Sequence, residues 1–187
     1  MNFVEPFPKD KIANIANWLK KYNEKYYVIF LIGISVGIRS CDILKLKIKD
    51  LENTDKITIK EQKTGKTKIF PLKPQIAKVV KDYIENYCDK EYQEYIFLGK
   101  KGARLDRSAV YRVFNRCVRE LGINMKCGNH SSRKFLAKNL YLQTKDIALV
   151  MEILNHSNMR TTFHYLGITQ DRIDEAYRDL DLGLQTV

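Results

Sequence analysis

The stretch LNHSNMRTTFHY occupies residues 154–165, and the shorter stretch NHSSR precedes it at residues 129–133. Two histidines, an arginine and a tyrosine from these stretches could converge on one anion. A histidine can exchange protons near neutral pH, an arginine presents a rigid fork of donors to phosphate oxygens, and a tyrosine hydroxyl can form a covalent ester with phosphorus. If the two stretches share a site, these residue types predict phosphodiester transesterification without a metal ion.

The overall charge favours a polyanionic partner. The chain has 187 residues, and its 33 Lys and Arg against 22 Asp and Glu leave a formal net charge of +11. Such a chain attracts nucleic acid through counterion release, whatever the base sequence. Its length allows a substantial core within one domain, and a hydrophobic content of 44% argues against disorder. We find neither a secretory signal nor a membrane-spanning stretch, so we expect a cytoplasmic protein with no membrane partner.

The four cysteines contain no CxxC pair, so they predict reduced thiols rather than a disulfide framework or a zinc ribbon. Cys127 precedes His130 by three residues, which is a spacing that some metal sites use. A metal site would need further ligands at matching distances, and the sequence does not suggest them. We therefore expect no metal ion and no other cofactor.

Hydrophobic periodicity predicts an α+β fold, mainly helical, with a small three-stranded antiparallel sheet. Residues 56–60 and 67–70 alternate like strands on either side of a Thr-Gly turn signal, and we expect residues 47–51 to add a third strand. Helices are expected after Pro8, over 26–36, as a short turn over 40–46, after Pro74, and over 107–121, 131–143, 145–155 and 170–180.

Basic residues are concentrated between positions 100 and 134, where the sequence has ten Lys or Arg and only two acidic residues, Asp106 and Glu120. A solvated helix face is the commoner meaning of such a pattern, but the net charge favours contact with phosphates. The residues that we expect to bind the DNA backbone are Lys66, Lys68, Arg104, Arg107 and Arg112.

Three blocks of the chain resemble the catalytic domain of the tyrosine recombinases, also called phage integrases. Residues 37–46, GIRSCDILKL, are similar to the first arginine box of that family, and residues 61–66, EQKTGK, to the hairpin that carries its catalytic lysine. The third block is HSSR at 130–133, followed by His156 and, nine residues later, Tyr165. The order and spacing of the blocks agree over nearly the whole chain.

The resemblance implies a role for each of these residues. Tyr165 would attack the scissile phosphate and form a 3'-phosphotyrosine with release of a 5'-hydroxyl. Arg39 and Arg133 would clamp the non-bridging oxygens, His130 would act as acid or base, and His156 would donate a hydrogen bond to phosphate. Ordinary structural roles are the alternatives: packing for the tyrosine, an ion pair with the nearby acid for Arg39, an exposed helix face for Arg133, a cap for His130 and a surface position for His156.

Two further assignments follow from the same blocks. Lys63 would protonate the leaving 5'-oxygen, and only its register within Lys-Thr-Gly distinguishes it from neighbouring lysines. Asp42, three residues after Arg39, would orient the guanidinium.

The chain departs from the family pattern in two places. Most members have a separate core-binding domain before the catalytic domain, whereas residues 1–187 read as one catalytic domain; an excised domain, a short recombinase like the fimbrial invertases, or dependence on a partner would each account for this. The second departure is Asn155, where the family usually has glycine before the histidine. Asparagine can also adopt the left-handed conformation, so we expect the turn to survive.

By resemblance, the chain would recombine double-stranded DNA of a mobile genetic element through a Holliday junction, giving integration, excision or inversion. It would be weakly associated alone and tetrameric on paired DNA sites, with residues 168–187 forming a helix that docks on a neighbouring protomer and with an accessory DNA-bending protein as a further partner. A type IB topoisomerase and a non-catalytic DNA-binding remnant are the alternatives. The target DNA sequence cannot be read from these motifs.

Overall fold

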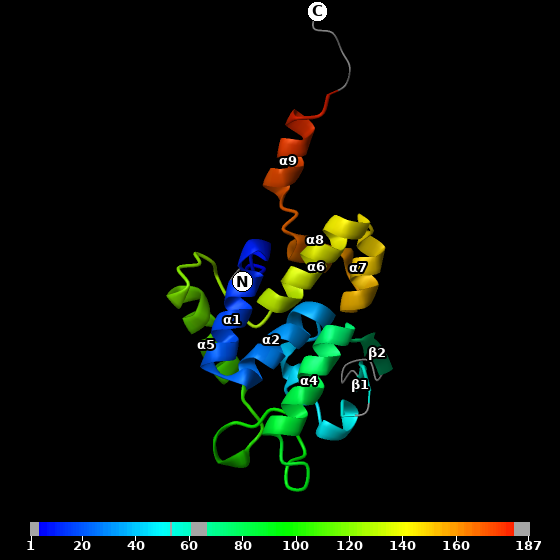
Figure 1. Cartoon of the computed structure of the whole chain (residues 1–187). Coiled ribbons are helices and arrows are strands. Elements are labelled where there is room, and N and C mark those ends of the chain that lie inside the picture. The colour runs from blue at the N-terminus through cyan, green and yellow to red at the C-terminus, as the bar shows by residue number, and fades with distance from the viewer. Residues whose placement is uncertain (1–3, 53, 61–66, 182–187) are drawn as a thin grey trace, which may run out of the picture. The chain divides into compact units, whose positions relative to one another are not determined.

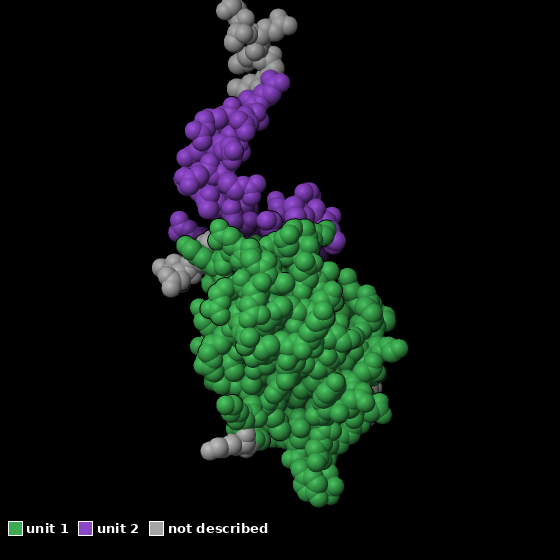
Figure 2. Space-filling model, turned by 60° about the vertical axis from the view of Figure 1, so that its left-hand side comes forward, with its two compact units in different colours: residues 1–136 green, residues 137–187 purple. Residues whose placement is uncertain are grey.

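The computed structural model of the chain describes residues 4–52, 54–60 and 67–181. The chain forms two compact units, residues 1–136 and residues 137–187, which Figure 2 shows in different colours. The described residues are mainly helical with a small antiparallel sheet, as predicted. None of the described helices is both long enough and apolar enough to cross a membrane.

Helix α2, Glu24–Val36, forms the centre of the first unit (Figure 1). It begins where the side chain of Asn23 accepts a hydrogen bond from the Lys25 amide, and it ends at Gly37, whose φ of 67° is left-handed. The helix predicted over 26–36 is therefore a buried helix that stops at Gly37. α1, Ile12–Tyr22, packs on α2 through Ile15 and Leu19, whereas its other face is polar.

The rest of the first unit surrounds α2. A short 3-10 turn, Lys9–Lys11, precedes α1, and a short helix, α3, Ser40–Ile43, follows α2. Helix α4, Pro74–Tyr87, packs on α2. Helix α5, Arg107–Glu120, packs on α1. Between α4 and α5 the chain forms isolated bridges at Tyr95 and Leu98 and a 3-10 turn, Lys100–Gly102.

The sheet has two strands among the described residues rather than three. β1, Lys56–Lys60, pairs with β2, Thr67–Pro71, as the predicted hairpin. The third strand predicted over 47–51 is wrong, because this segment forms the 3-10 turn Ile48–Asp50. The Asp50 carboxylate accepts a hydrogen bond from the Lys47 amide at 3.0 Å. Ile48 and the residue three positions on are both buried, which is helical spacing and not strand alternation.

Among the described residues, the second unit contains four helices. They are α6, Ser131–Thr144, most of which belongs to this unit; α7, Ile147–Leu154; α8, Met159–Leu166; and α9, Gln170–Arg178. Its core is small and consists of Ala137, Val150, Leu154 and Leu166. α9 buries none of its residues.

Candidate active site

Arg39 lies at the junction between α2 and α3. Its extended backbone is the N-cap of α3, and its carbonyl accepts hydrogen bonds from the amides of Asp42 and Ile43 at 2.8 and 3.1 Å. The guanidinium is exposed, which leaves it accessible to a ligand. Within the described residues Arg39 forms no ion pair with Asp42, whose carboxylate accepts from the Cys41 thiol instead. Orientation of Arg39 by Asp42 therefore stays a prediction.

Arg133 is buried, with 5% of its surface exposed, so the alternative of an exposed helix face is wrong. Its Nη1 donates a hydrogen bond to the carbonyl of Gly37, which ties the first turn of α6 to the end of α2. Glycine allows the two helices to approach closely, because a Cβ on Gly33 would lie 2.9 Å from the Cβ of Ser132. The guanidinium is thus fixed in position before any ligand arrives.

His130 lies at the start of α6, close enough to Arg133 and Arg39 for their positive charges to act on its imidazole. The Ser40 hydroxyl donates to the Asn129 carbonyl at 2.8 Å, which joins the start of α3 to the turn that carries His130. The His130 carbonyl accepts the Lys134 amide at 2.8 Å, so its backbone has the capping position while its side chain remains at the surface. Partial desolvation, and then the positive charges of Arg133 and Arg39, lower the pKa of His130. A neutral imidazole can accept a proton near neutral pH.

In the second unit, Asn155 ends α7 in the left-handed conformation, with φ 51° and ψ 50°. The expectation that the turn survives with asparagine in place of glycine is confirmed. The His156 amide donates to the Met151 carbonyl at 2.9 Å, which closes the helix end and fixes the start of the loop. The turn therefore fixes the backbone from which the His156 side chain projects.

His156 and Tyr165 lie side by side. Their ring centroids are 4.7 Å apart and the ring planes meet at 71°, an edge-to-face arrangement. Tyr165 is half-buried on α8, where it packs against the small core of the unit, and Asn158 caps the start of this helix. His164 is exposed, as expected of a surface residue.

The structure thus brings the predicted residues together in two groups. Arg39, His130 and Arg133 form one group in the first unit, and His156 with Tyr165 forms the other in the second unit. Convergence of the two groups on one phosphate stays a prediction.

The predicted hairpin residues are only partly described. Lys63 and Lys66 lie outside the described residues. Lys68 is half-buried on β2, opposite Ile59 of β1.

Two of the predicted DNA-binding residues, Arg104 and Arg112, line a basic hollow of the first unit with Lys25, Lys100 and Arg116. We define these five residues as the basic hollow. Its rim also includes two tyrosines, Tyr22 and Tyr26, and one acidic residue, Asp106, which caps α5 through the Ser108 amide.

Arg107, the remaining predicted residue, does not line the basic hollow. It is close enough to His130 for its positive charge to contribute to the lowered pKa of that imidazole. Our sequence reasoning missed Lys25, because an isolated lysine in the first turn of a helix carries no recognisable signal. It also missed Thr162, whose hydroxyl contacts His156.

Comparison with known proteins places these residues in context. Residues 6–172 match the model of the phage integrase family. The probable integrase/recombinase YoeC of Bacillus subtilis (strain 168) is 33% identical over 184 residues, which cover 95% of this chain and 97% of that protein. Tyrosine recombinase XerA of Pyrococcus furiosus is 27% identical over 96% of this chain, but the match spans only 58% of XerA. The chain therefore spans a little over half the length of that relative.

Solved structures show the same fold. The crystal structure of XerA recombinase matches 95% of this chain and 64% of its own, with a TM-score of 0.78 and 20% identity. The catalytic domain of bacteriophage HP1 integrase matches 98% of this chain and 99% of its own, with a TM-score of 0.62 and 19% identity. XerH bound to its difH substrate before cleavage matches with a TM-score of 0.73 at 23% identity and covers 96% of this chain and 55% of its own.

Proposed function

Because the chain belongs to the phage integrase family, we propose that it is a site-specific DNA recombinase that cuts and rejoins strands through a 3'-phosphotyrosine at Tyr165. The observation that supports this most is the edge-to-face contact between His156 and Tyr165, since it puts a hydrogen-bond donor beside the nucleophile. Relatives in this family are named recombinases or integrases, and the XerH structure contains the DNA substrate of that protein.

The chemical step would exchange one phosphate ester for another. The Tyr165 oxygen attacks phosphorus, its bond to phosphorus forms, and the bond from phosphorus to the 5'-oxygen breaks. A phenol with a pKa near ~10 must lose its proton in this step, and a neutral His130 can accept it. Lys63 would protonate the departing 5'-oxygen. Rejoining reverses these transfers when a 5'-hydroxyl attacks the phosphotyrosine.

Arg39 and Arg133 would stabilise the negative charge that gathers on the non-bridging oxygens. The transition state carries more charge on these oxygens than the substrate does, so fixed donors lower the barrier. Arg133 is suited to this because its hydrogen bond to the Gly37 carbonyl holds one side of the guanidinium and leaves other donors available. His156 would add a further hydrogen bond to the same oxygens.

A nicked suicide DNA substrate tests the proposal, because loss of a short 5'-strand traps the covalent intermediate. The wild-type protein should give an adduct that survives a denaturing gel, whereas Tyr165→Phe should give none. Tyr141→Phe is the matched control, because Tyr141 is also half-buried against the same small core, and it should retain the adduct. An adduct that persists in Tyr165→Phe would contradict the proposal.

Two further assays address the alternatives. Relaxation of supercoiled plasmid by the protein alone would favour a type IB topoisomerase. Failure to form any adduct on the cognate site would favour a DNA-binding remnant.

The role of Lys63 has its own test. A substrate with sulfur in place of the bridging 5'-oxygen has a leaving group that needs no proton. Lys63→Ala should cleave ordinary DNA slowly and recover on the sulfur substrate, and Lys68→Ala serves as the control on the same hairpin. Equal defects of Lys63→Ala on both substrates would argue that Lys63 is not the general acid.

The basic hollow would bind the DNA backbone. Among the described residues, Lys100, Arg104 and Arg112 form no ion pair, so their charges remain available to phosphates. Removal of one charge that binds a phosphate should reduce the slope of log K against log salt by about one. Arg112→Gln should show this reduction, and Arg119→Gln should not, because Arg119 is an exposed arginine on the same helix outside the hollow. Equal slopes for the two variants would contradict this surface.

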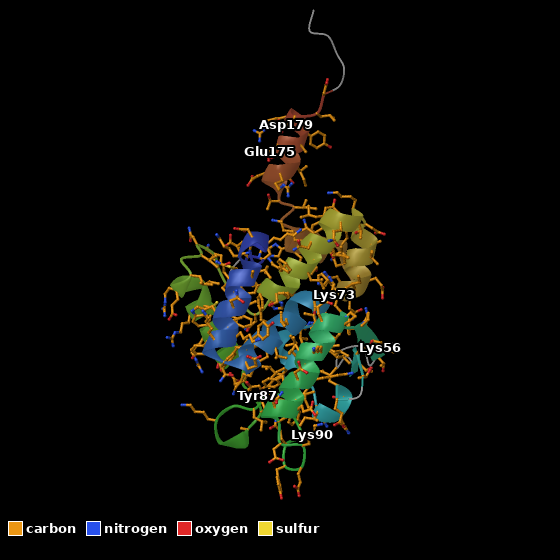
Figure 3. All side chains as sticks on the ribbon, viewed as in Figure 1. Lys56, Lys73, Tyr87, Lys90, Glu175 and Asp179 are labelled. Carbon is orange, nitrogen blue, oxygen red and sulfur yellow. The ribbon has the colours of Figure 1, made fainter. Side chains whose placement is uncertain are left out.

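Helix α9 would dock on a second copy of the chain. Ile173 and Tyr177 of α9 are 40% and 75% exposed, and Leu180, which follows the helix, is 58% exposed, so the apolar face of this segment is largely open. Figure 3 shows two acidic side chains of this segment, Glu175 on α9 and Asp179 at its C-cap.

The surface beside α9 suits such a partner. An apolar hollow there is lined on one side by Lys138, Tyr141 and Leu142 of α6 and by Lys145 just after it, and on the other side by Ile173, Tyr177 and Leu180. Its two lysines complement an acidic helix. Sedimentation on DNA with paired sites should show tetramers, whereas Tyr177→Asp should give bound monomers. Tetramers formed by Tyr177→Asp would contradict this docking.

A further inference from the structure

We propose that Thr162 is a positioning residue that fixes the tautomer of His156. Thr162 lies on α8 and is fully buried, with 0% of its surface exposed. Its Oγ1 is 2.9 Å from Nδ1 of His156, which is an ordinary hydrogen-bond distance. The catalytic consequence rests on the proposed function, but the hydrogen bond and the tautomer do not.

The direction of this hydrogen bond follows from the needs of the hydroxyl. Among the described residues, the hydroxyl of Thr162 has one hydrogen-bond partner, Nδ1 of His156. A buried hydroxyl that only accepted would leave its proton without an acceptor, at a cost of roughly 1–3 kcal/mol. The arrangement that satisfies the hydroxyl has Thr162 donating to an unprotonated Nδ1.

A neutral imidazole carries one ring proton, so an accepting Nδ1 places that proton on Nε2. Nε2 is then a donor, which is what a contact with a phosphate oxygen requires. The opposite tautomer would have its proton on Nδ1, and its Nε2 could only accept. Thr162 therefore selects the form of His156 that can bind phosphate.

Helix α8 couples this selection to the nucleophile. Thr162 and Tyr165 are three residues apart, so they lie on neighbouring positions of one helix face. The hydroxyl holds one edge of the imidazole while Tyr165 contacts the ring edge to face. A single short helix thus carries the attacking group and the group that orients the neighbouring donor.

The tautomer can be measured without DNA. Long-range proton–nitrogen NMR of protein labelled with ¹⁵N-histidine distinguishes a protonated ring nitrogen from an unprotonated one. The chain has three histidines, so the signals that disappear in His156→Gln identify this residue. At a pH where the ring is neutral, His156 should carry its proton on Nε2. A proton on Nδ1 in the wild-type protein would overturn the proposal.

Variants separate the hydroxyl from the shape of the side chain. Thr162→Val keeps the shape and removes the hydroxyl, so His156 should become a mixture of tautomers. Thr162→Ser restores the hydroxyl and should restore the Nε2–H form, and Thr161→Val is the control at an exposed neighbouring threonine. An unchanged His156 spectrum in folded Thr162→Val would overturn the proposal.

The suicide substrate then measures the catalytic consequence. Loss of one aligned donor to a transition-state oxygen costs roughly 100-fold in rate, and partial loss of the correct tautomer costs less. Adduct formation should therefore slow by about 10- to 100-fold in Thr162→Val and by less than about threefold in Thr162→Ser. A shifted tautomer with unchanged adduct formation would overturn the positioning role. Loss of all adduct in the wild-type protein would instead count against the proposed function.

Discussion

Residues 1–136 and residues 137–187 support their predicted site residues with different amounts of core. In the first unit, a cluster of buried side chains extends along the sequence from Phe7 to Cys127, and Arg133 is anchored on the helix at its centre. In the second unit, Tyr165 rests on a short helix and packs against a small core.

This difference separates two tasks. In the proposed mechanism, clamping a phosphate requires donors that do not move, and the proposed donors Arg39 and Arg133 belong to the unit with the larger core. The proposed nucleophile, Tyr165, would attack, remain bonded to DNA and then be released, so a helix with little buried surface around it is suited to local rearrangement. The hydrogen bonds made by Asn158 and Thr162 order the second unit where its core is small.

Truncation of the two arginines should have the largest effects. Both Arg39→Ala and Arg133→Ala should slow adduct formation by about 100- to 1,000-fold, because each removes a donor to the charged oxygens. Arg133→Ala should also lower the free energy of unfolding by about 2–4 kcal/mol, because it leaves a cavity and an unsatisfied Gly37 carbonyl. The exposed Arg39 should change this free energy by less than about 0.5 kcal/mol. Adduct time courses measure the rates, and urea unfolding measures the free energies of unfolding. Equal losses of stability in Arg39→Ala and Arg133→Ala would contradict the anchoring of Arg133.

Alanine at a left-handed glycine tests the two units directly. Gly37→Ala should lower the free energy of unfolding by about 2–4 kcal/mol, because it adds both backbone strain and a Cβ only 2.5 Å from Leu136 Cδ2. Gly167→Ala should lower the free energy of unfolding by only about 1 kcal/mol, the cost of backbone strain, because no neighbouring atom lies within 4 Å of the added Cβ. Chemical denaturation of the two variants gives these values. A larger loss for Gly167→Ala would reverse the contrast between the units.

The pH dependence of stability should originate partly at His130. Because folding lowers the pKa of His130 below its usual value of about 6.5, the folded state favours the neutral ring. The stabilisation is complete above pH ~6.5 and is lost as the pH falls through the lowered pKa, since the unfolded chain then binds the proton more readily. Melting temperatures measured from neutral to acidic pH should fall less in His130→Gln than in the wild type. His164→Gln, at an exposed position, should follow the wild-type curve.

The smallest effect is expected at the end of α7. Asn155→Gly should change the free energy of unfolding by less than about 1 kcal/mol, because glycine adopts the left-handed conformation easily but gains freedom in the unfolded chain. Asn155→Val should lower the free energy of unfolding by more than Asn155→Gly does, because a β-branched residue is strained at φ 51°. Thermal melting compares the two variants, and a valine variant as stable as the glycine variant would contradict this geometry.

Local patterns in the sequence were sufficient to predict most of the fold. The apolar run that forms α2 and the glycine that ends it could be recognised because both are signals of neighbouring residues. The left-handed turn at Asn155 was predicted for the same reason.

Contacts between distant residues could not be predicted. The wrong strand over 47–51 is a local error instead, because the Asp50 carboxylate and the burial of Ile48 and Leu51, three residues apart, select a helical turn. The burial of Arg133 depends on close packing against the glycines of α2, which no local pattern shows. The basic hollow likewise combines side chains from α2, α5 and the loop between α4 and α5.

The most direct test of the central claim is to identify the amino acid that bonds to DNA. The adduct trapped on a suicide substrate is digested with nuclease and trypsin, and the peptide with added nucleotide mass is sequenced by mass spectrometry. The chain contains eleven tyrosines, and we predict that the nucleotide is on Tyr165, in the tryptic peptide that spans residues 161–172. Attachment to any other residue would contradict the account.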